Sequence, residues 1–236
     1  MSIDGFNEGL KYFLESVTRD PNYALAYAGL SDSYQELSIS GALPPLEASP
    51  KSEAAARKAL SIDDGLAQAH APLGNTSCLY DWKWTDAERE FKRALDLDPH
   101  YATAHIEYAV YLSAMGRQDE AVAEARQAHM LDPVSQTTNS LEGFVYFLGR
   151  QFDEAIRQLQ NTIALYPDTA INHDMLAACY EQKEMYREAM DEYLKADAIG
   201  GLSSHRLATL LQAFAASGFK GYLQREVRSE CGVTAC

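Results

Sequence analysis

A short motif returns at a fixed interval along this chain of 236 residues. Leu-Asp-Pro occurs at Leu97–Pro99 and again at Leu131–Pro133, and Leu-Tyr-Pro follows at Leu165–Pro167. Both intervals are 34 residues, a period typical of chains that stack one helix–turn–helix unit many times. In such a chain each unit packs mainly against its neighbours. The sequence therefore predicts an all-α fold, an α-solenoid of about five full repeats with partial capping units at both ends.

Residues at the same place in successive repeats also have the same size. In the first helix of each repeat one column is always small: Ser31, Gly74, Ala109, Gly143 and Ala177. In the second helix another column is always alanine: Ala87, Ala121, Ala155 and Ala189. Adjacent helices approach closely only where their side chains are small. We therefore expect these columns to mark the helix crossings, with large residues such as Phe91 and Leu159 between repeats.

Prolines, or a glycine in the last repeat, end the second helices and divide the chain into segments. The predicted organisation is a single solenoid domain, 1–236, with these parts: an N-terminal half repeat at 1–21, a repeat with an insertion at 22–64, repeats at 65–99, 100–133, 134–167 and 168–201, a C-terminal cap at 202–228 and a tail at 229–236. The half repeat is predicted to hold one helix over Glu8–Arg19, and Gly218 is predicted to interrupt the cap.

One step in the repeat is longer than the others. Ser31 and Gly74 are equivalent positions but lie 43 residues apart, nine more than the period. Gly41 and the Pro44-Pro45 pair are predicted to break the first helix there, and a proline favours the start of the next helix. Two interpretations stay open, because an insertion of this kind either lengthens both helices or forms a loop that contacts a ligand.

The next turn carries two tryptophans. Trp82 and Trp84 either fill the turn between two helices or form an exposed hot spot for a partner. With Pro44 and Pro45 of the insertion, they form a possible accessory surface. Thr85, with Glu88 three residues later, matches a capping box and predicts that the second helix begins there.

The net charge of the chain indicates which kinds of partner it can bind. The chain has 34 acidic and 20 basic side chains, a formal net charge of −14. This excess of negative charge disfavours nucleic-acid binding and favours a protein or peptide partner that is neutral to basic rather than acidic. No signal peptide and no membrane-spanning apolar stretch is visible, so membrane binding is not expected. The expected location is the cytoplasm, or the periplasm if the chain derives from a membrane-anchored protein.

No pattern of reactive residues predicts chemistry. The cysteines Cys78 and Cys179 fall within helical patterns, where a free cysteine usually behaves as a small core residue. His70 and His105 occupy corresponding places in two repeats, which favours a packing role over a ligand role. Phosphate-binding glycine loops, nucleophile motifs and zinc-binding spacings are all missing. The sequence predicts no catalytic residue, no cofactor and no metal site, and therefore not an enzyme.

Three segments are specific enough to suggest a family. Tyr101–His105, Gly116–Ala121 and Ala128–Pro133 resemble tetratricopeptide-repeat (TPR) proteins, and the resemblance covers nearly the whole chain. Three further segments, Asp20–Leu30, Leu43–Leu46 and Tyr80–Trp84, most resemble the TPR tails of bacterial multidomain regulators. Those regulators are winged-helix or protein-kinase proteins, often with a TolB-like region.

The resemblance implies a right-handed superhelix whose first helices line a concave groove. Projecting the family's inward positions onto this sequence implies a partner-binding groove formed by these residues: Asp32, Gln35, Gln68, Asn75, Thr103, Ile106, Val110, Phe144, Phe147, Asp174 and Glu181. No Lys or Arg is among them, so this groove departs from the family members that clamp acidic peptide tails with cationic donors.

Two functions follow as hypotheses. The first is a non-catalytic scaffold that binds a peptide or a helical partner in the concave groove. The alternative is the regulatory or sensor tail of a bacterial transcription regulator or protein kinase whose effector domain is absent from this chain.

Overall fold

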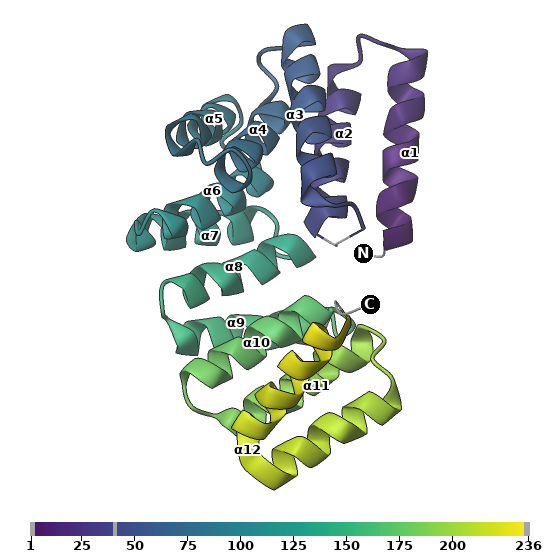
Figure 1. Cartoon of the computed structure of the whole chain (residues 1–236). Coiled ribbons are helices and arrows are strands. Elements are labelled where there is room, and N and C mark those ends of the chain that lie inside the picture. Colours follow the sequence, from purple (N-terminus) through teal and green to yellow (C-terminus); the bar gives the residue numbers. More distant parts are fainter. Residues whose placement is uncertain (1–2, 40–41, 234–236) are drawn as a thin grey trace. The chain divides into compact units, whose positions relative to one another are not determined.

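The computed structural model describes residues 3–39 and 42–233. Over these residues the chain forms twelve α-helices and no β-strand (Figure 1). The helices have these bounds: α1 Ile3–Arg19, α2 Ala24–Ile39, α3 Pro45–Ile62, α4 Ala67–Leu79, α5 Trp84–Leu97, α6 Ala102–Ala114, α7 Gln118–Leu131, α8 Gln136–Leu148, α9 Phe152–Leu165, α10 Ala170–Gln182, α11 Tyr186–Ile199 and α12 Ser204–Val233. The predicted all-α class is confirmed.

The helices group into two compact units, which are described separately. The first unit is Met1–Pro133 and the second is Val134–Cys236, so the division falls at one of the predicted repeat boundaries. In the first unit α2 packs on α3, α4 on α5 and α6 on α7. In the second unit α8 packs on α9 and α10 on α11. Each pair is one helix–turn–helix repeat, as the 34-residue period predicts.

Small residues mark the helix crossings, as predicted. Ala87, Ala121, Ala155 and Ala189 are all 0% exposed. At Gly74 an added Cβ would lie only 2.8 Å from the ring of Phe91. Such a contact is too short for an unstrained packing arrangement. The backbone of α4 therefore approaches α5 more closely than any side chain larger than hydrogen allows.

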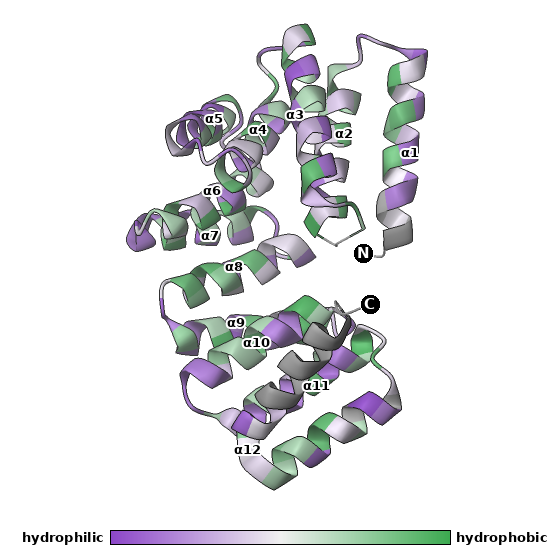
Figure 2. Cartoon of the chain, viewed as in Figure 1, coloured by the Kyte–Doolittle hydropathy of each residue, from purple (hydrophilic) through white to green (hydrophobic). Residues whose placement is uncertain are grey.

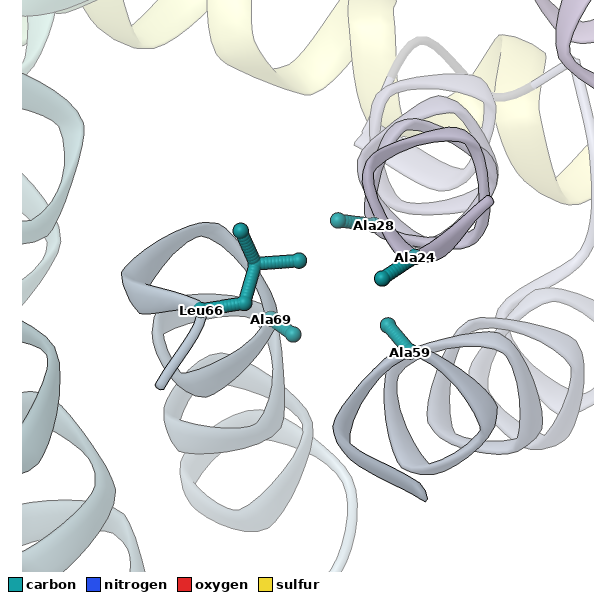
Figure 3. Packing of buried hydrophobic residues seen from close by; sticks show 5 residues of the cluster. All are labelled: Ala24, Ala28, Ala59, Leu66 and Ala69. Atoms are coloured by element: carbon teal, nitrogen blue, oxygen red, sulfur yellow. The ribbon is translucent and has the colours of Figure 1, made fainter. Parts of the chain in front are cut away.

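Small side chains also form the core between adjacent repeats. Figure 3 shows Ala24 and Ala28 of α2, Ala59 of α3, and Leu66 and Ala69 at the start of α4 directed toward one another. The half-buried side chains of Tyr27, Leu60 and Ile62 pack against this cluster. Alanines allow three helices to meet, and the few larger side chains fill the space that remains.

The turns inside the four repeats from α4–α5 to α10–α11 use a left-handed backbone conformation at a constant position. Its φ angle is 57° at Trp82, 74° at Gly116, 56° at Arg150 and 60° at Glu184. These residues are 34 apart. Glycine adopts this conformation without a steric penalty, whereas a residue with a Cβ is destabilised there by roughly 1–2 kcal/mol. Three of the four repeats therefore keep a strained residue in the turn.

Glu184→Gly should accordingly stabilise the second unit by about 1 kcal/mol. Glu184 is a suitable position because its side chain is exposed. The reverse change, Gly116→Glu in the first unit, should lower stability by a similar amount. Urea unfolding followed by circular dichroism measures both free energies, and a loss of stability in Glu184→Gly would contradict the assignment of strain.

The structure settles the shape of the insertion and corrects two predicted helix starts. The extra residues lengthen both α2 and α3, and Pro45 stands in the first turn of α3; the predicted break at Gly41 lies outside the described residues. The helix predicted over Glu8–Arg19 begins earlier, at Ile3. The predicted capping box is wrong, because α5 begins at Trp84 and no side chain caps it.

The C-terminal helix is bent where predicted. Gly218 has φ 63°, so α12 consists of two helical segments joined at this residue. The second segment continues to Val233, into the range predicted as a tail, and the last residues of that tail are outside the described part.

Figure 2 shows hydrophilic residues interspersed with hydrophobic ones along the long helices α1 and α3. Among the described helices, none combines the length and the apolar composition needed to cross a bilayer.

Candidate partner-binding surface

The first helices of the repeats form the inner side of each unit. In the first unit α2 contacts α4 and α4 contacts α6, whereas among the described residues α3, α5 and α7 do not contact one another. In the second unit α8 contacts α10, and the described parts of α9 and α11 do not meet. Helices that converge lie on the inside of a curved stack, so α2, α4 and α6 form the inner face of the first unit, and α8 and α10 that of the second.

These inner helices lack the two permanently charged basic residues. None of α2, α4, α6, α8 and α10 contains Lys or Arg. They contain these carboxylates: Asp32, Glu36, Glu107, Glu142, Asp174 and Glu181. The second helices, in contrast, hold exposed cations such as Arg89, Lys92 and Arg157. The asymmetry of charge extends over whole helices, well beyond the predicted groove positions.

On the inner face of the first unit the predicted residues lie at two depths. Gln35 and Ile106 are only 7% and 1% exposed, so they support the face from below. The Gln35 amide donates to the Pro72 carbonyl at 2.8 Å, which fixes its orientation. The remaining predicted residues on these helices are half-buried: Asp32, Gln68, Asn75, Thr103 and Val110.

On the inner face of the second unit two aromatic rings lie side by side. Phe144 and Phe147 are half-buried, with ring centroids 6.4 Å apart and an interplanar angle of 14°. Phe147 also meets Phe152 of α9, with a centroid distance of 5.9 Å. Of the predicted acids, Asp174 is exposed, and Glu181 accepts a hydrogen bond from the Tyr193 hydroxyl at 3.2 Å.

Three carboxyl groups of the first unit influence one another, and two of them were not among the predicted residues. We call Asp32, Glu36 and Glu107 the carboxylate cluster; all three are half-buried. Desolvation, together with the charge of Glu36, raises the pKa of Asp32 to about 7. Desolvation raises the pKa of Glu36, and desolvation followed by the charges of Asp32 and Glu36 raises the pKa of Glu107 well above its ordinary value.

The two carboxylate oxygens of Glu107 differ in their hydrogen bonding. The side-chain amide of Asn75 donates a hydrogen bond to Glu107 and another, at 3.2 Å, to Gln35. The second carboxylate oxygen of Glu107, Oε2, is shielded from solvent and accepts no hydrogen bond from the described residues. A shielded acceptor without a donor is destabilising, by about 1–3 kcal/mol.

The histidines serve packing, as their recurrence predicts, and a third one joins them. The Nδ1 atoms meet a carboxylate oxygen of the second helix in the pairs His70–Glu90 at 2.7 Å, His105–Glu124 at 2.5 Å and His173–Glu192 at 2.6 Å. Each Nε2 meets a backbone carbonyl six residues earlier. In the α8–α9 repeat the equivalent pair is Asn139 and Gln158, whose side chains hydrogen bond at 3.0 Å.

Of the predicted accessory surface, Pro44, Pro45 and Trp82 are exposed and Trp84 is half-buried. Trp82 is 70% exposed, and its ring meets that of Trp84 edge to face with centroids 5.5 Å apart. Cys78 and Cys179 are buried and free, which confirms their predicted place in the core. In the part of the chain that the structure describes, no three His, Cys, Asp or Glu side chains are grouped so that they could hold a metal ion.

Known proteins resemble this chain over most of its length. No family model matches it. The Homo sapiens protein named Tetratricopeptide repeat protein 6 is 23% identical to it over 194 residues, which cover 82% of this chain and 36% of the human protein. The chain therefore spans little more than a third of the length of that relative.

Solved structures share its fold. A chain of the APC/C hetero-tetramer Cut9–Hcn1 has a TM-score of 0.68 at 19% identity, over 89% of this chain and 40% of that one. PilF of Pseudomonas aeruginosa has a TM-score of 0.64 at 20% identity, over 93% and 95%. YrrB, described as a TPR protein with an unusual peptide-binding site, has a TM-score of 0.50 at 20% identity, over 85% and 97%. With the stacked helix pairs, these similarities identify the fold as a TPR solenoid.

Proposed function

We propose that the chain is a non-catalytic scaffold that binds an extended peptide or a helical segment of a protein partner on its inner faces. The observation that carries this proposal is the complete lack of Lys and Arg on the five inner helices. A surface of this kind repels an acidic segment and accepts one that is neutral to basic.

The side chains of the inner faces suit such a segment. The amides of Gln68 and Asn75 are of the kind that pairs with a peptide backbone, and the adjacent rings of Phe144 and Phe147 can cover an apolar side chain. Two structural neighbours support the same function by their descriptions, because YrrB has a peptide-binding site and Cut9 and Hcn1 form a hetero-tetramer.

We also propose three finer properties. The excess of carboxylates supports binding to protein rather than to nucleic acid or membranes. The location that we propose is the cytoplasm. The insertion at Leu43–Leu46 and the Tyr80–Trp84 segment support a relationship to the TPR tails of bacterial regulators. A coding sequence that joins these repeats to a winged-helix or kinase domain would establish that relationship.

The double variant Asn75→Ala/Phe144→Ala tests the proposed function. It changes one inner-face residue in each unit, so partner capture from a lysate should be abolished while helicity stays the same. Circular dichroism must accompany the capture experiment, because Asn75 also donates a hydrogen bond to Gln35. Cross-linking of the captured partner should map to α2, α4, α6, α8 or α10.

A matched control is a pair of exposed residues away from the inner faces. Tyr12 and Leu165 are 61% and 58% exposed, and Tyr12→Ala/Leu165→Ala should capture partners normally. Unchanged capture by the inner-face variant, or cross-links confined to the second helices, would rule out the proposed function.

A further inference from the structure

The ring of His105 joins α6 to two other segments of the first unit. Its Nδ1 atom lies 2.5 Å from a carboxylate oxygen of Glu124 on α7, and its Nε2 atom lies 3.0 Å from the backbone carbonyl oxygen of Pro99, before α6. His105 is only 8% exposed. His70 and His173 make the same two kinds of contact in their own repeats. The arrangement is therefore a recurring part of the fold.

Both atoms that the His105 ring contacts are hydrogen-bond acceptors. A carbonyl oxygen has no hydrogen to donate, and an ionised carboxylate only accepts. A neutral imidazole carries a single N–H, so one of its nitrogens would direct a lone pair of electrons at one of these oxygens. The doubly protonated ring, in contrast, donates to both oxygens. The two hydrogen bonds thus require one proton more than a neutral histidine holds.

The α8–α9 repeat forms the same link without that proton. Asn139, at the position of His105, donates from its side-chain amide to the Ser135 carbonyl at 2.7 Å and accepts from the Gln158 amide at 3.0 Å. An amide offers a donor and an acceptor at the same time, so this neutral pair satisfies both contacts without a change in protonation. The chain therefore contains one structural link in two chemical forms, and only the His–Glu form titrates.

We propose that His105 and Glu124 form a proton-dependent clamp: the doubly protonated ring holds the start of α6 to α7 and to the preceding turn, and loss of a proton from the ring breaks one of these two contacts. Burial lowers the pKa of His105, but the hydrogen bonds to Glu124 and to the Pro99 carbonyl raise it by more. The clamp is therefore closed at acidic pH and opens as the pH rises.

The charged groups around the ring favour its protonation. α6 packs against α4, α5 and α7. The charges that act on His105 are those of Glu124 and of Asp98 in the turn before α6, and both are negative. α4 and α6 contain no Lys or Arg, and His70 of α4 is bonded to Glu90. Cations of α5 and α7 are bound to carboxylates elsewhere: Arg89 to Asp86, Lys92 to Glu88, and Arg117 to Glu88 and Glu120.

NMR of the imidazole rings tests the clamp directly. Long-range ¹H–¹⁵N correlation spectra of the ¹⁵N-labelled full chain distinguish the doubly protonated ring from both neutral tautomers, and His105→Asn identifies the signals of His105. We expect more than half of the His105 rings to be doubly protonated at pH 6.5, the ordinary pKa of histidine. Glu124→Gln should lower the midpoint of this titration by about one pH unit, because it removes a charge-assisted hydrogen bond.

A second carboxylate of the same helix provides the matched control. Asp119 is exposed on α7, so Asp119→Asn should leave the midpoint of His105 unchanged. A singly protonated His105 ring at pH 6.5 in the parent chain, or the same midpoint in Glu124→Gln as in the parent chain, would overturn the clamp.

A transplanted pair tests whether the proton stabilises the fold. His105→Asn/Glu124→Gln gives α6 and α7 the neutral pair of the α8–α9 repeat, so this variant should fold even if Glu124→Gln does not. The urea midpoint of the first unit, followed by the fluorescence of Trp82 and Trp84, should fall less between pH 6 and pH 8.5 than in the parent chain. An equal fall in the two proteins would show that the link does not depend on the proton of His105.

Discussion

Phe91→Ala should lower the free energy of unfolding by about 3–5 kcal/mol. The Phe91 side chain is 0% exposed, and its ring lies with its centroid 5.8 Å from both the Tyr108 and the Tyr111 rings of the next repeat. On the other side it lies against the backbone of Gly74. Removing the ring leaves a cavity between two repeats, and the tightly crossed helices cannot move together to close it.

The two tryptophans report the loss of stability in the unit that contains Phe91. Trp82 and Trp84 are the only tryptophans of the chain and both belong to the first unit. Their fluorescence during urea unfolding should show an earlier transition in Phe91→Ala. Phe144→Ala is a control in the second unit, because Phe144 is half-buried and stacks on Phe147; it should leave the tryptophan transition unchanged and lose only about 1 kcal/mol by circular dichroism. A loss below about 1 kcal/mol in Phe91→Ala would contradict the packing described here.

The chain should become less stable as the pH rises from 5.5 to 8.5, by roughly 2 kcal/mol. Asp32 is the main reason. Its pKa is raised from 3.8 to about 7 by desolvation and by Glu36, so the folded chain holds a proton that the unfolded chain releases. Between these two pKa values each rise in pH favours the unfolded state.

His105 acts in the same direction. Burial alone would lower its pKa, but hydrogen bonds to Glu124 and to the Pro99 carbonyl, together with the charges of Glu124 and Asp98, raise it above 6.5. The stabilisation by the charged imidazole is complete below the unfolded-state pKa and is lost as the pH rises through the folded-state pKa. The acidic and the basic group therefore both favour unfolding at higher pH.

Urea unfolding at several pH values, followed by circular dichroism and by tryptophan fluorescence, measures this dependence. Asp32→Asn should flatten the profile between pH 5.5 and 8.5 and should stabilise the chain at pH 8. Asp191→Asn, which changes an exposed carboxylate of α11, should leave the profile as it is. Stability that rises toward pH 8.5, or an unchanged profile in Asp32→Asn, would show that the carboxylate cluster does not titrate as described.

The elements predicted from the sequence are those that depend on local rules. The 34-residue period, the alanine column and the prolines that end the second helices each act within one repeat or between two adjacent ones. The same holds for Pro45 at the start of α3. The predicted capping box failed because the side chains at that turn have other partners: Glu88 binds Lys92 and also Arg117 of the next repeat. A local pattern does not reveal that competition.

Fewer features of the candidate partner-binding surface could be predicted from the sequence. The family's inward positions include Asp32, Asn75 and Thr103, and the structure places these on the inner face of the first unit. Glu36 and Glu107 are not inward positions of the family pattern. The lack of Lys and Arg along the whole length of α2, α4 and α6 was a signal that the sequence contained. It did not predict how far Glu36 and Glu107 lie from Asp32.

The 34-residue repeat thus determined by itself that this protein is a stack of helix pairs, because the same small side chains must recur wherever the same crossing recurs. Only the tertiary structure decided where its charge is unbalanced. In the first unit α2 contacts α4 and α4 contacts α6, so the charges of Asp32 and Glu36 act on Glu107 although these residues are far apart in the sequence. Electrostatic interactions depend on distance in space and on desolvation, and neither quantity is contained in a repeat pattern.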